Sequence, residues 1–522
     1  MIKLLFSTPD AEAGALVRAA LRRSVSRSQV QWRAEGELTL AEGGIIIAIN
    51  PTEQLARKLI ACRDAGNCKI IVFGCLPDYL ISALSLSALP WPESLAISAK
   101  SLPAPTYGYA ESAALVRYSR AAEKLQASGW SRRFERFDFA DEWNNLGYGA
   151  IRSGQGIWAV AQSLKADPAC ELAQVEIDGV ASMTYAALLD QMGSSLLWIN
   201  RPVGTIDSFE WRLIERFVSS YRFDELPCQP VVLEIPWGHD AAITMRLDCD
   251  EDVESARALW EAYRAMQVPF SLAVHASILA DQRHYRILQE MVAAGESILS
   301  HTATHAPNWG GTYEAAYREA CESAALIHAA TGVPVRYAVS PFHQTPKYAL
   351  NGLADAGYLG VVGGIIRNDP AFLIARGGEL AGLPAGFVGH SQQTMLHGDC
   401  MLAGDDPLAI FKAAFDLAKE TSALFGYLDH PFSERYQYGW SDEEYRIARH
   451  RDFVSYIRQR ATNPLFLSEN AALDFLRAKM ELQIQQDQAG YRLVNASEAG
   501  GMLCPTVEYR GQHSAALNGA IV

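Results

Sequence analysis

Short apolar segments that alternate with helix-period segments are the feature that most limits how this 522-residue chain can fold. Near the N-terminus, strands are predicted over 2–7, 44–50 and 69–74, with helices over 11–23 and 54–62. Strands that are apolar at every position are buried on both faces, which is typical of a parallel sheet covered by helices. Residues 1–230 are therefore expected to form a parallel-sheet α/β domain.

The rest of this first region is less regular. The patterns predict strands over 156–162, 172–177 and 195–200, a helix over 206–221, and a proline-rich loop or linker over 87–107. Two prolines within 226–230 predict a domain boundary there, because proline interrupts both helices and central strands. No glycine-rich phosphate-binding motif occurs, so the sequence predicts no nucleotide site.

From residue 231 to about residue 480 the alternation of strands and helices is longer. Strands are predicted over 242–248, 270–274, 297–300, 336–340, 359–363 and 424–430, and helices over 252–266, 282–294, 313–330 and 408–420. About 250 residues of this pattern is the size of a (β/α) barrel, in which chemistry lies at the carboxyl ends of the strands. The last segment, 481–522, predicts a small β extension of short antiparallel strands.

Composition excludes several classes of protein. With 49% hydrophobic and 20% charged residues, the chain has the composition of a soluble globular protein. Its net charge of −14 argues against a nucleic-acid partner. No apolar run reaches the length of a membrane span, and the N-terminal apolar segment is too short for a signal peptide. Nine scattered cysteines without a C-x-x-C pair fit reduced thiols, and a cytoplasmic location is predicted.

The histidines are unevenly distributed. All 12 lie at or after His239, and ten of them lie between His239 and His430. Imidazole is the commonest metal ligand and the usual proton carrier near neutral pH, so the two halves of the chain are expected to have different functions. The alternative is that structural histidines cluster there by chance.

A pair of carboxylates ends the strand predicted over 242–248. Side chains alternate along a strand, so Arg246, Asp248 and Asp250 should share one side. Two carboxylates placed together need a cation, a metal or a shared proton. Glu251 and Glu254 are instead interpreted as acidic residues of a helix first turn.

Two further groups follow predicted strands. His301 and His305 are four residues apart, so they lie on one face of a helical turn and can bind one metal ion. The alternative is a pair of loop histidines with hydroxyl partners. His430 closes another apolar strand, where it can act as a general acid if it faces the metal. Taken alone, such a histidine is more often structural.

The order of these residues resembles a known family. Asp-x-Asp at 248–250, His-Thr-x-x-His at 301–305, Ser-Pro-Phe at 340–342 and the late His430 resemble the polysaccharide deacetylase (NodB-homology) family, carbohydrate esterase family four. The resemblance covers residues 231–463. It implies a distorted (β/α) barrel of the NodB-homology type that removes N-acetyl groups from amino sugars with a divalent metal.

The resemblance also implies roles for single residues. Asp248 matches the catalytic base and His430 the general acid. Asp250, His301 and His305 match the metal ligands, with Zn²⁺ the preferred ion. Pro341 and Phe342 match the groove motif that binds the substrate and whose backbone N–H stabilises the oxyanion.

Two positions depart from the family pattern. Cys249 separates two aspartates that are usually adjacent, and Val339 stands where an arginine usually orients the base. We hypothesise that Arg246, two residues before Asp248 on the same strand face, supplies that charge instead.

The expected function is hydrolysis of an N-acetyl group from an amino sugar in a cytosolic glycan, lipid-linked or nucleotide-sugar intermediate, with release of acetate. The alternatives are a metal-dependent amidohydrolase acting on a non-sugar C–N bond such as a cyclic ureide or imide, and a non-catalytic module that binds glycan or a partner. Residues 1–230 are expected to recruit substrate, bind a partner or form a homo-oligomer. His343, 397–399 and 309–311 are additional candidates for the pocket, each with an equally good structural interpretation.

Overall fold

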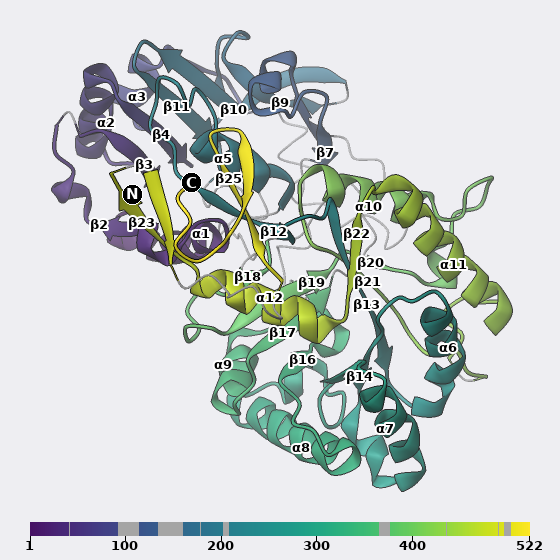
Figure 1. Cartoon of the computed structure of the whole chain (residues 1–522). Helices are drawn as coiled ribbons and strands as arrows, with labels where there is room; N and C mark the ends of the chain where they lie inside the picture. Colours follow the sequence, from purple (N-terminus) through teal and green to yellow (C-terminus); the bar gives the residue numbers. More distant parts are fainter. Residues whose placement is uncertain are drawn as a thin grey trace.

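The computed structural model describes residues 1–40, 42–91, 114–133, 160–177, 179–201, 208–364, 376–434, 436–488, 490–494 and 503–522. Two large sheets dominate this part of the chain, one in each half of the molecule (Figure 1). No helix in these ranges combines the length and apolar character needed to span a bilayer. The predicted loop over 87–107 and the predicted strand over 156–162 lie mostly outside the described residues.

The first sheet has nine strands within the described residues, in the order β2-β1-β3-β4-β11-β10-β9-β6-β7. They are β1 (Ile2–Leu5), β2 (Val30–Arg33), β3 (Gly44–Ile49), β4 (Cys68–Phe73), β6 (Ala114–Tyr118), β7 (Ser131–Arg133), β9 (Glu171–Ile177), β10 (Val180–Gln191) and β11 (Ser194–Ile199). Pairing is parallel from β2 to β11 and antiparallel from β11 to β7.

The prediction of a parallel sheet is therefore right for five strands and wrong for the others. Only two residues separate β9 from β10, and only two separate β10 from β11. A parallel connection needs a dozen or more residues, so such short turns impose hairpins. Gly179 and Gly193 supply the positive φ angles that these turns require.

Helices cover both faces of the parallel part, as predicted from its continuously apolar strands. Ile45 and Ile47 of β3 pack in a cluster with α1 and α5, whereas Ile46 and Ala48 pack in a second cluster with α2 and α3. These helices are α1 (Ala11–Ser24), α2 (Glu53–Ala65), α3 (Asp78–Ala83) and α5 (Ser208–Ser219).

The second sheet holds the strands that carry the candidate site. Its order is β18-β19-β17-β16-β15-β14-β13-β21-β20, with β22 also paired to β13. The strands are β13 (Ala241–Cys249), β14 (Ser271–Val274), β15 (Ser297–Ser300), β16 (Tyr337–Val339), β17 (Gly360–Gly364), β18 (Gly378–Glu379), β19 (Val388–Gln392), β20 (Thr394–Met395), β21 (Phe425–Asp429) and β22 (Pro464–Leu467). The six strands predicted between residues 242 and 430 are confirmed within one or two residues.

The described residues form no closed barrel, so the predicted barrel is corrected to an open sheet. Only Gln393 separates β19 from β20, yet β19 pairs with β17 and β20 pairs with β21. The segment 388–395 thus pairs with β17 toward one end of the sheet and with β21 toward the other. Its own two strands, β19 and β20, do not pair with each other. All pairings except that of β18 are parallel, so the carboxyl ends of the other strands lie along one edge.

Helices connect these strands. They are α6 (Arg257–Ala265), α7 (Tyr285–Ala293), α8 (Tyr313–Thr331), α9 (Lys347–Asp355), α10 (Ala409–Glu420), α11 (Glu443–Arg460) and α12 (Glu469–Glu481). The helix predicted over 252–266 begins as a 3-10 turn, Val253–Ala256, before α6. The patterns did not predict α9, α11 or α12.

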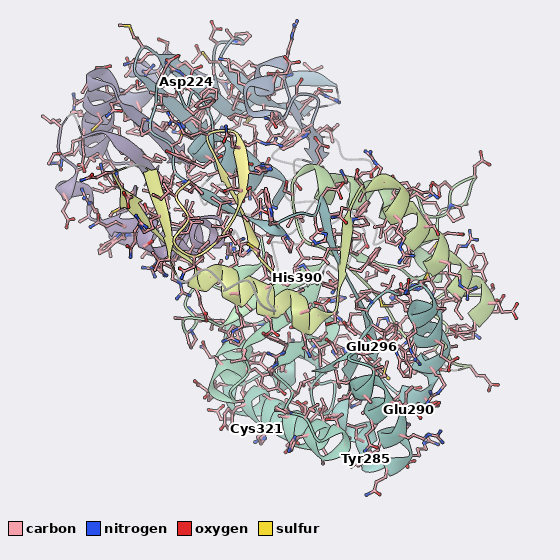
Figure 2. The ribbon with its side chains drawn as sticks, in the orientation of Figure 1. Asp224, Tyr285, Glu290, Glu296, Cys321 and His390 are labelled. Carbon is pink, nitrogen blue, oxygen red and sulfur yellow. The ribbon has the colours of Figure 1, made fainter. Side chains whose placement is uncertain are left out.

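The C-terminal strands lie beside the N-terminal half of the molecule (Figure 1). As predicted, β23 (Gln483–Asp487) and β24 (Gly490–Val494) are antiparallel. β25 (Pro505–Tyr509) pairs with both β26 (Gln512–Ala515) and β12 (Val231–Pro236). Glu508 of β25 forms a buried ion pair with Arg212 of α5. In the middle of the molecule, His390 of β19 lies close to α12, 3.9 Å from Glu469 (Figure 2).

Candidate metal and hydrolytic site

Strand β13 presents a buried arginine–aspartate pair at its carboxyl end. Leu247 and Cys249 point into the hydrophobic core, so Arg246 and Asp248 share the opposite face, as predicted. The Arg246 guanidinium donates from Nε to Asp248 Oδ1 at 2.5 Å and from Nη2 to Oδ2 at 2.9 Å. Both side chains are almost fully buried. This two-point contact fixes the orientation of the Asp248 carboxylate.

Asp250, His301 and His305 converge, as the sequence predicted. Oδ1 of Asp250 lies 3.4 Å from Nε2 of His301 and 3.4 Å from Nε2 of His305. The two Nε2 atoms are 3.0 Å apart. Asp250 Oδ1 is buried and has no hydrogen-bond partner among the described residues. These three side chains form a group whose ligand atoms all lie within 4.8 Å of one another.

The hydrogen bond on the far side of His301 defines its tautomer. Nδ1 of His301 lies 3.2 Å from the backbone oxygen of Val339. A carbonyl only accepts hydrogen bonds, so Nδ1 carries a proton, and in the neutral ring Nε2 would keep its lone pair for a metal ion. Val339, directly before the Ser-Pro-Phe segment, thus contacts His301 through its backbone oxygen.

Residues 301–306 form an irregular loop, so the predicted helical turn is wrong. Thr302 and His305 have φ angles of +65° and +54°. Such left-handed backbone is costly for a β-branched residue and persists only where neighbouring contacts enforce it. Ser300 Oγ accepts from the Thr302 N–H at 3.2 Å, and Thr302 Oγ1 accepts from the His305 N–H at 2.9 Å. This folded-back loop, rather than a helix face, brings the two imidazoles together.

Charge and burial act in opposite directions on the two aspartates. Burial by itself would raise the pKa of Asp248, but the Arg246 guanidinium outweighs it and holds that pKa well below its usual range. The same balance holds for Asp250, where the histidines lower the pKa. Burial lowers the pKa of His305 to about 4, and His301 beside it adds to the effect. Near neutral pH, both carboxylates are ionised and His305 is neutral, as metal ligands must be. For His301, burial would lower the pKa, but Asp248 and Asp250 outweigh burial and raise it.

His430 reaches the same site from the end of β21. Its Nε2 lies 3.9 Å from Asp250 Oδ2, and its Nδ1 lies 2.9 Å from Nε2 of His397. Tyr438 stacks on His430, with ring centroids 4.0 Å apart, and donates its hydroxyl hydrogen to Asp250 Oδ2 at 3.2 Å. Sequence reasoning missed Tyr438, because it lies in a loop whose approach to Asp250 no spacing rule reports. A small hollow beside the aspartates is lined in part by His430, Tyr436 and Tyr438.

The Ser-Pro-Phe segment forms a tight turn next to the histidines. Phe342 has a φ angle of +53°, its ring lies 4.6 Å from that of His305, and 41% of the residue is exposed. Pro341 is buried. His343 is also buried, and burial lowers its pKa to about 3.

Of the remaining candidates, some contact site residues and others stabilise the loops around the site. Trp309 is fully buried and donates its indole N–H to the backbone oxygen of Gln344 at 2.9 Å, so it anchors a loop and offers no surface for a sugar ring. His397 contacts His430, as described. His275, which the sequence did not single out, lies with Nδ1 2.9 Å from the backbone oxygen of Asp250 and so supports that residue from behind.

Residues 249–361 match the family model described as "Polysaccharide deacetylase". The match confirms the resemblance inferred from the motifs over this part of the chain. It supports a hydrolase of the deacetylase type, and the structure supplies candidate groups of metal ligands. A search of curated proteins returned no match.

Several solved structures are similar to about half of the chain. An allantoinase is 14% identical, with 46% of this chain and 91% of that one covered and a TM-score of 0.36. A family 4 acetyl xylan esterase from Clostridium thermocellum, in complex with a cobalt ion, is 11% identical, with 45% and 90% covered and a TM-score of 0.31. A family 4 carbohydrate esterase from Bacillus anthracis is 14% identical, with 45% and 82% covered and a TM-score of 0.28.

Proposed function

We propose that this chain is a metal-dependent N-deacetylase that hydrolyses the acetamide of an amino sugar and releases acetate. The observation that carries the proposal is the convergence of Asp250, His301 and His305 beside the oriented carboxylate of Asp248. The match of residues 249–361 to the deacetylase family supports the reaction class. We further propose a division into residues 1–230, a catalytic region over 231–480 and an extension over 481–522.

The residues that would hold the metal are Asp250, His301 and His305. Their donor set fits a divalent ion, because a carboxylate and two imidazoles suit Zn²⁺ and similar metals and leave coordination positions open. The unpartnered Asp250 Oδ1 and the lone pair of His301 Nε2 support this fit. When bound, such an ion polarises the amide oxygen and lowers the pKa of a water molecule.

Asp248 is proposed as the general base. An amide is a poor electrophile, so the attacking water must lose a proton as it adds to the carbonyl carbon. Arg246 holds both carboxylate oxygens, which keeps Asp248 ionised and its orientation fixed. Arg246 thereby performs the orienting role of the arginine that Val339 replaces.

His430 is proposed as the general acid. The departing amine is a poor leaving group unless its nitrogen is protonated, and His430 Nε2 faces the Asp250 side of the site. Phe342 and Pro341 are proposed to form the substrate side of the site. There the backbone N–H of Phe342 would stabilise the negative charge on the acetyl oxygen, an effect worth about 3 kcal/mol for a single donor.

The proposed substrate is an N-acetylated saccharide, and the proposed location is cytoplasmic. A cytosolic glycan, a lipid-linked saccharide and a nucleotide sugar remain the predicted sources of the acetamide. Substrate recruitment, partner binding and homo-oligomerisation remain the predictions for residues 1–230.

The test is acetate release from a panel of N-acetylhexosamine conjugates by protein loaded with one divalent metal at a time. Acetate release by the wild type and at least 100-fold less by Asp248→Asn would support the proposal. Hydrolysis of a cyclic ureide or imide without any acetate release would assign the site to the non-sugar amidohydrolase alternative. Stoichiometric metal with no hydrolysis of either substrate class would favour a binding module.

A further inference from the structure

The inner side of His430 contacts a second imidazole. Nδ1 of His430 lies 2.9 Å from Nε2 of His397, and the rings are tilted by 58° with centroids 4.9 Å apart. The side chain of His397 is only 6% exposed. His430 itself is 14% exposed, with Nε2 toward Asp250. His430 therefore has one nitrogen toward the proposed reaction site and one toward a buried neutral partner.

The carboxylate of the preceding residue, Asp429, accepts from the backbone N–H of His430. Oδ1 of Asp429 is 3.8 Å from His397 Nε2, which is beyond hydrogen-bond distance. Its two oxygens already accept hydrogen bonds from four donors. These are Arg446 Nε at 2.7 Å, His450 Nε2 at 3.0 Å, Trp440 Nε1 at 3.3 Å and the backbone N–H of His430 at 2.8 Å. Asp429 therefore binds the backbone N–H of His430, whereas Nδ1 of the His430 imidazole contacts His397.

The number of protons on the two rings determines which imidazole donates the hydrogen bond between His430 Nδ1 and His397 Nε2. Where no metal ion joins them, two imidazole nitrogens 2.9 Å apart share one proton, because two protonated nitrogens would repel and two bare nitrogens would make no bond. On its other side, His397 Nδ1 lies 3.9 Å from Asp399 Oδ1. That distance is beyond hydrogen-bond range, as is the 3.8 Å from His397 Nε2 to Asp429 Oδ1, so neither carboxylate decides the His397 tautomer. The proposed general-acid role of His430 decides it, because a ring that transfers a proton from Nε2 keeps its other proton on Nδ1. His397 Nε2 is then the acceptor, and His430 donates from Nδ1.

We propose that His397 is the positioning residue of His430. By accepting from His430 Nδ1–H, it fixes the neutral ring in the tautomer whose bare Nε2 faces the site. This inference rests on the proposed general-acid role of His430. In the proton balance, Nε2 takes a proton from solvent and then transfers it to the departing nitrogen as the C–N bond breaks, which returns the ring to its neutral form. The Nδ1 proton stays in the bond to His397 throughout.

The test compares two His397 variants that differ in one hydrogen-bond acceptor. His397→Leu fills the space without an acceptor, whereas His397→Gln offers an amide oxygen near the position of Nε2. Amide hydrolysis needs protonation of the leaving group, but an activated ester such as 4-nitrophenyl acetate does not. We expect His397→Leu to lower kcat on an N-acetylhexosamine by at least 30-fold and ester hydrolysis by less than threefold. His397→Gln should recover most of the kcat on the amide.

A matched control and an independent readout complete the experiment. His390→Leu removes a histidine of similar burial that contacts Glu469 outside the site, and it should leave the amide-to-ester ratio unchanged. In ¹⁵N spectra of imidazole-labelled wild type, the His430 signal, assigned by its loss in His430→Gln, should show a protonated Nδ1. In His397→Leu the same ring should become a mixture of tautomers.

Several outcomes would overturn the inference. They are equal loss of amide and ester hydrolysis in His397→Leu, no loss of either, a His397→Gln variant no better than His397→Leu, and a His430 ring protonated at Nε2 in the wild type. If the wild type itself releases no acetate from any substrate, the proposed function fails instead, and the tautomer measurement still tests the imidazole pair.

Discussion

Arg246 and Asp248 contact each other through two hydrogen bonds on one face of β13, with heavy-atom distances of 2.5 Å and 2.9 Å. Both residues lie on a single strand, so the strand's own period of two supplies the contact. An arginine at the position of Val339 would have to reach Asp248 from β16, which β15 and β14 separate from β13 in the sheet. The contact that we propose to orient the base is thus made within β13 alone.

Replacing Arg246 by methionine should lower kcat on an acetylated amino sugar by at least 100-fold, because Asp248 loses the donors that orient it. It should also destabilise the fold by about 3 kcal/mol, the usual cost of leaving a buried charge without its partner. Steady-state kinetics and urea unfolding measure the two effects. Unchanged turnover would show that Arg246 does not orient the base.

Asp248→Asn and His305→Ala should separate catalysis from metal binding. Asp248→Asn removes the proposed base but no proposed ligand, so metal content should stay near the wild-type value while activity falls by 10²-fold to 10⁴-fold. His305→Ala removes a ligand, so metal content and activity should fall together. Metal analysis of dialysed protein is the measurement, and equal metal loss in both variants would contradict the assigned roles.

Lys479 of α12 should make the free energy of unfolding change with pH in the alkaline range. Its ammonium is buried and has no hydrogen-bond partner among the described residues, and burial lowers its pKa to about 8. The unfolded chain, with a lysine pKa of about 10.4, binds more protons between pH 8 and 10, so stability contributed by this group rises with pH there. Lys479→Met should therefore be more stable than the wild type at pH 7.

The advantage of Lys479→Met should shrink by about 1.4 kcal/mol for each pH unit between 8 and 10. Urea unfolding of both proteins across this range measures it. Lys124→Met, at a lysine whose side chain is 43% exposed, is the control and should show no such trend. A constant difference between Lys479→Met and wild type across the range would contradict the prediction.

Asp429→Asn should destabilise the protein by about 3 kcal/mol, because the buried Arg446 would lose the carboxylate at its Nε and keep only that of Glu443. The Arg446 guanidinium overcomes the effect of burial and holds the pKa of Asp429 well below its usual range. The stabilisation is therefore present above the unfolded pKa of about 3.9 and is lost as the pH falls below it. Urea unfolding at pH 7 and pH 3 should show a smaller difference between the two proteins at pH 3.

The sequence by itself determined the strands of the second sheet and which candidate residues stand at their ends. Continuous apolar segments placed the strands of the second sheet, and the period of two along β13 placed Arg246 beside Asp248. Both patterns are local, because burial on two faces and side-chain alternation depend only on neighbouring residues. The motif order likewise located Asp250, His301, His305 and His430 at strand ends.

Only the tertiary structure decided how these elements close and which partners they find. Two-residue turns converted part of the first sheet to hairpins, and the switch of partners at Gln393 left the second sheet open. The left-handed loop at Thr302 gathered the histidines where a helical turn was expected. Tyr438 on Asp250 and His397 on His430 are contacts between distant segments. They depend on loop paths that are fixed by packing across the whole fold, and no spacing in the sequence records them.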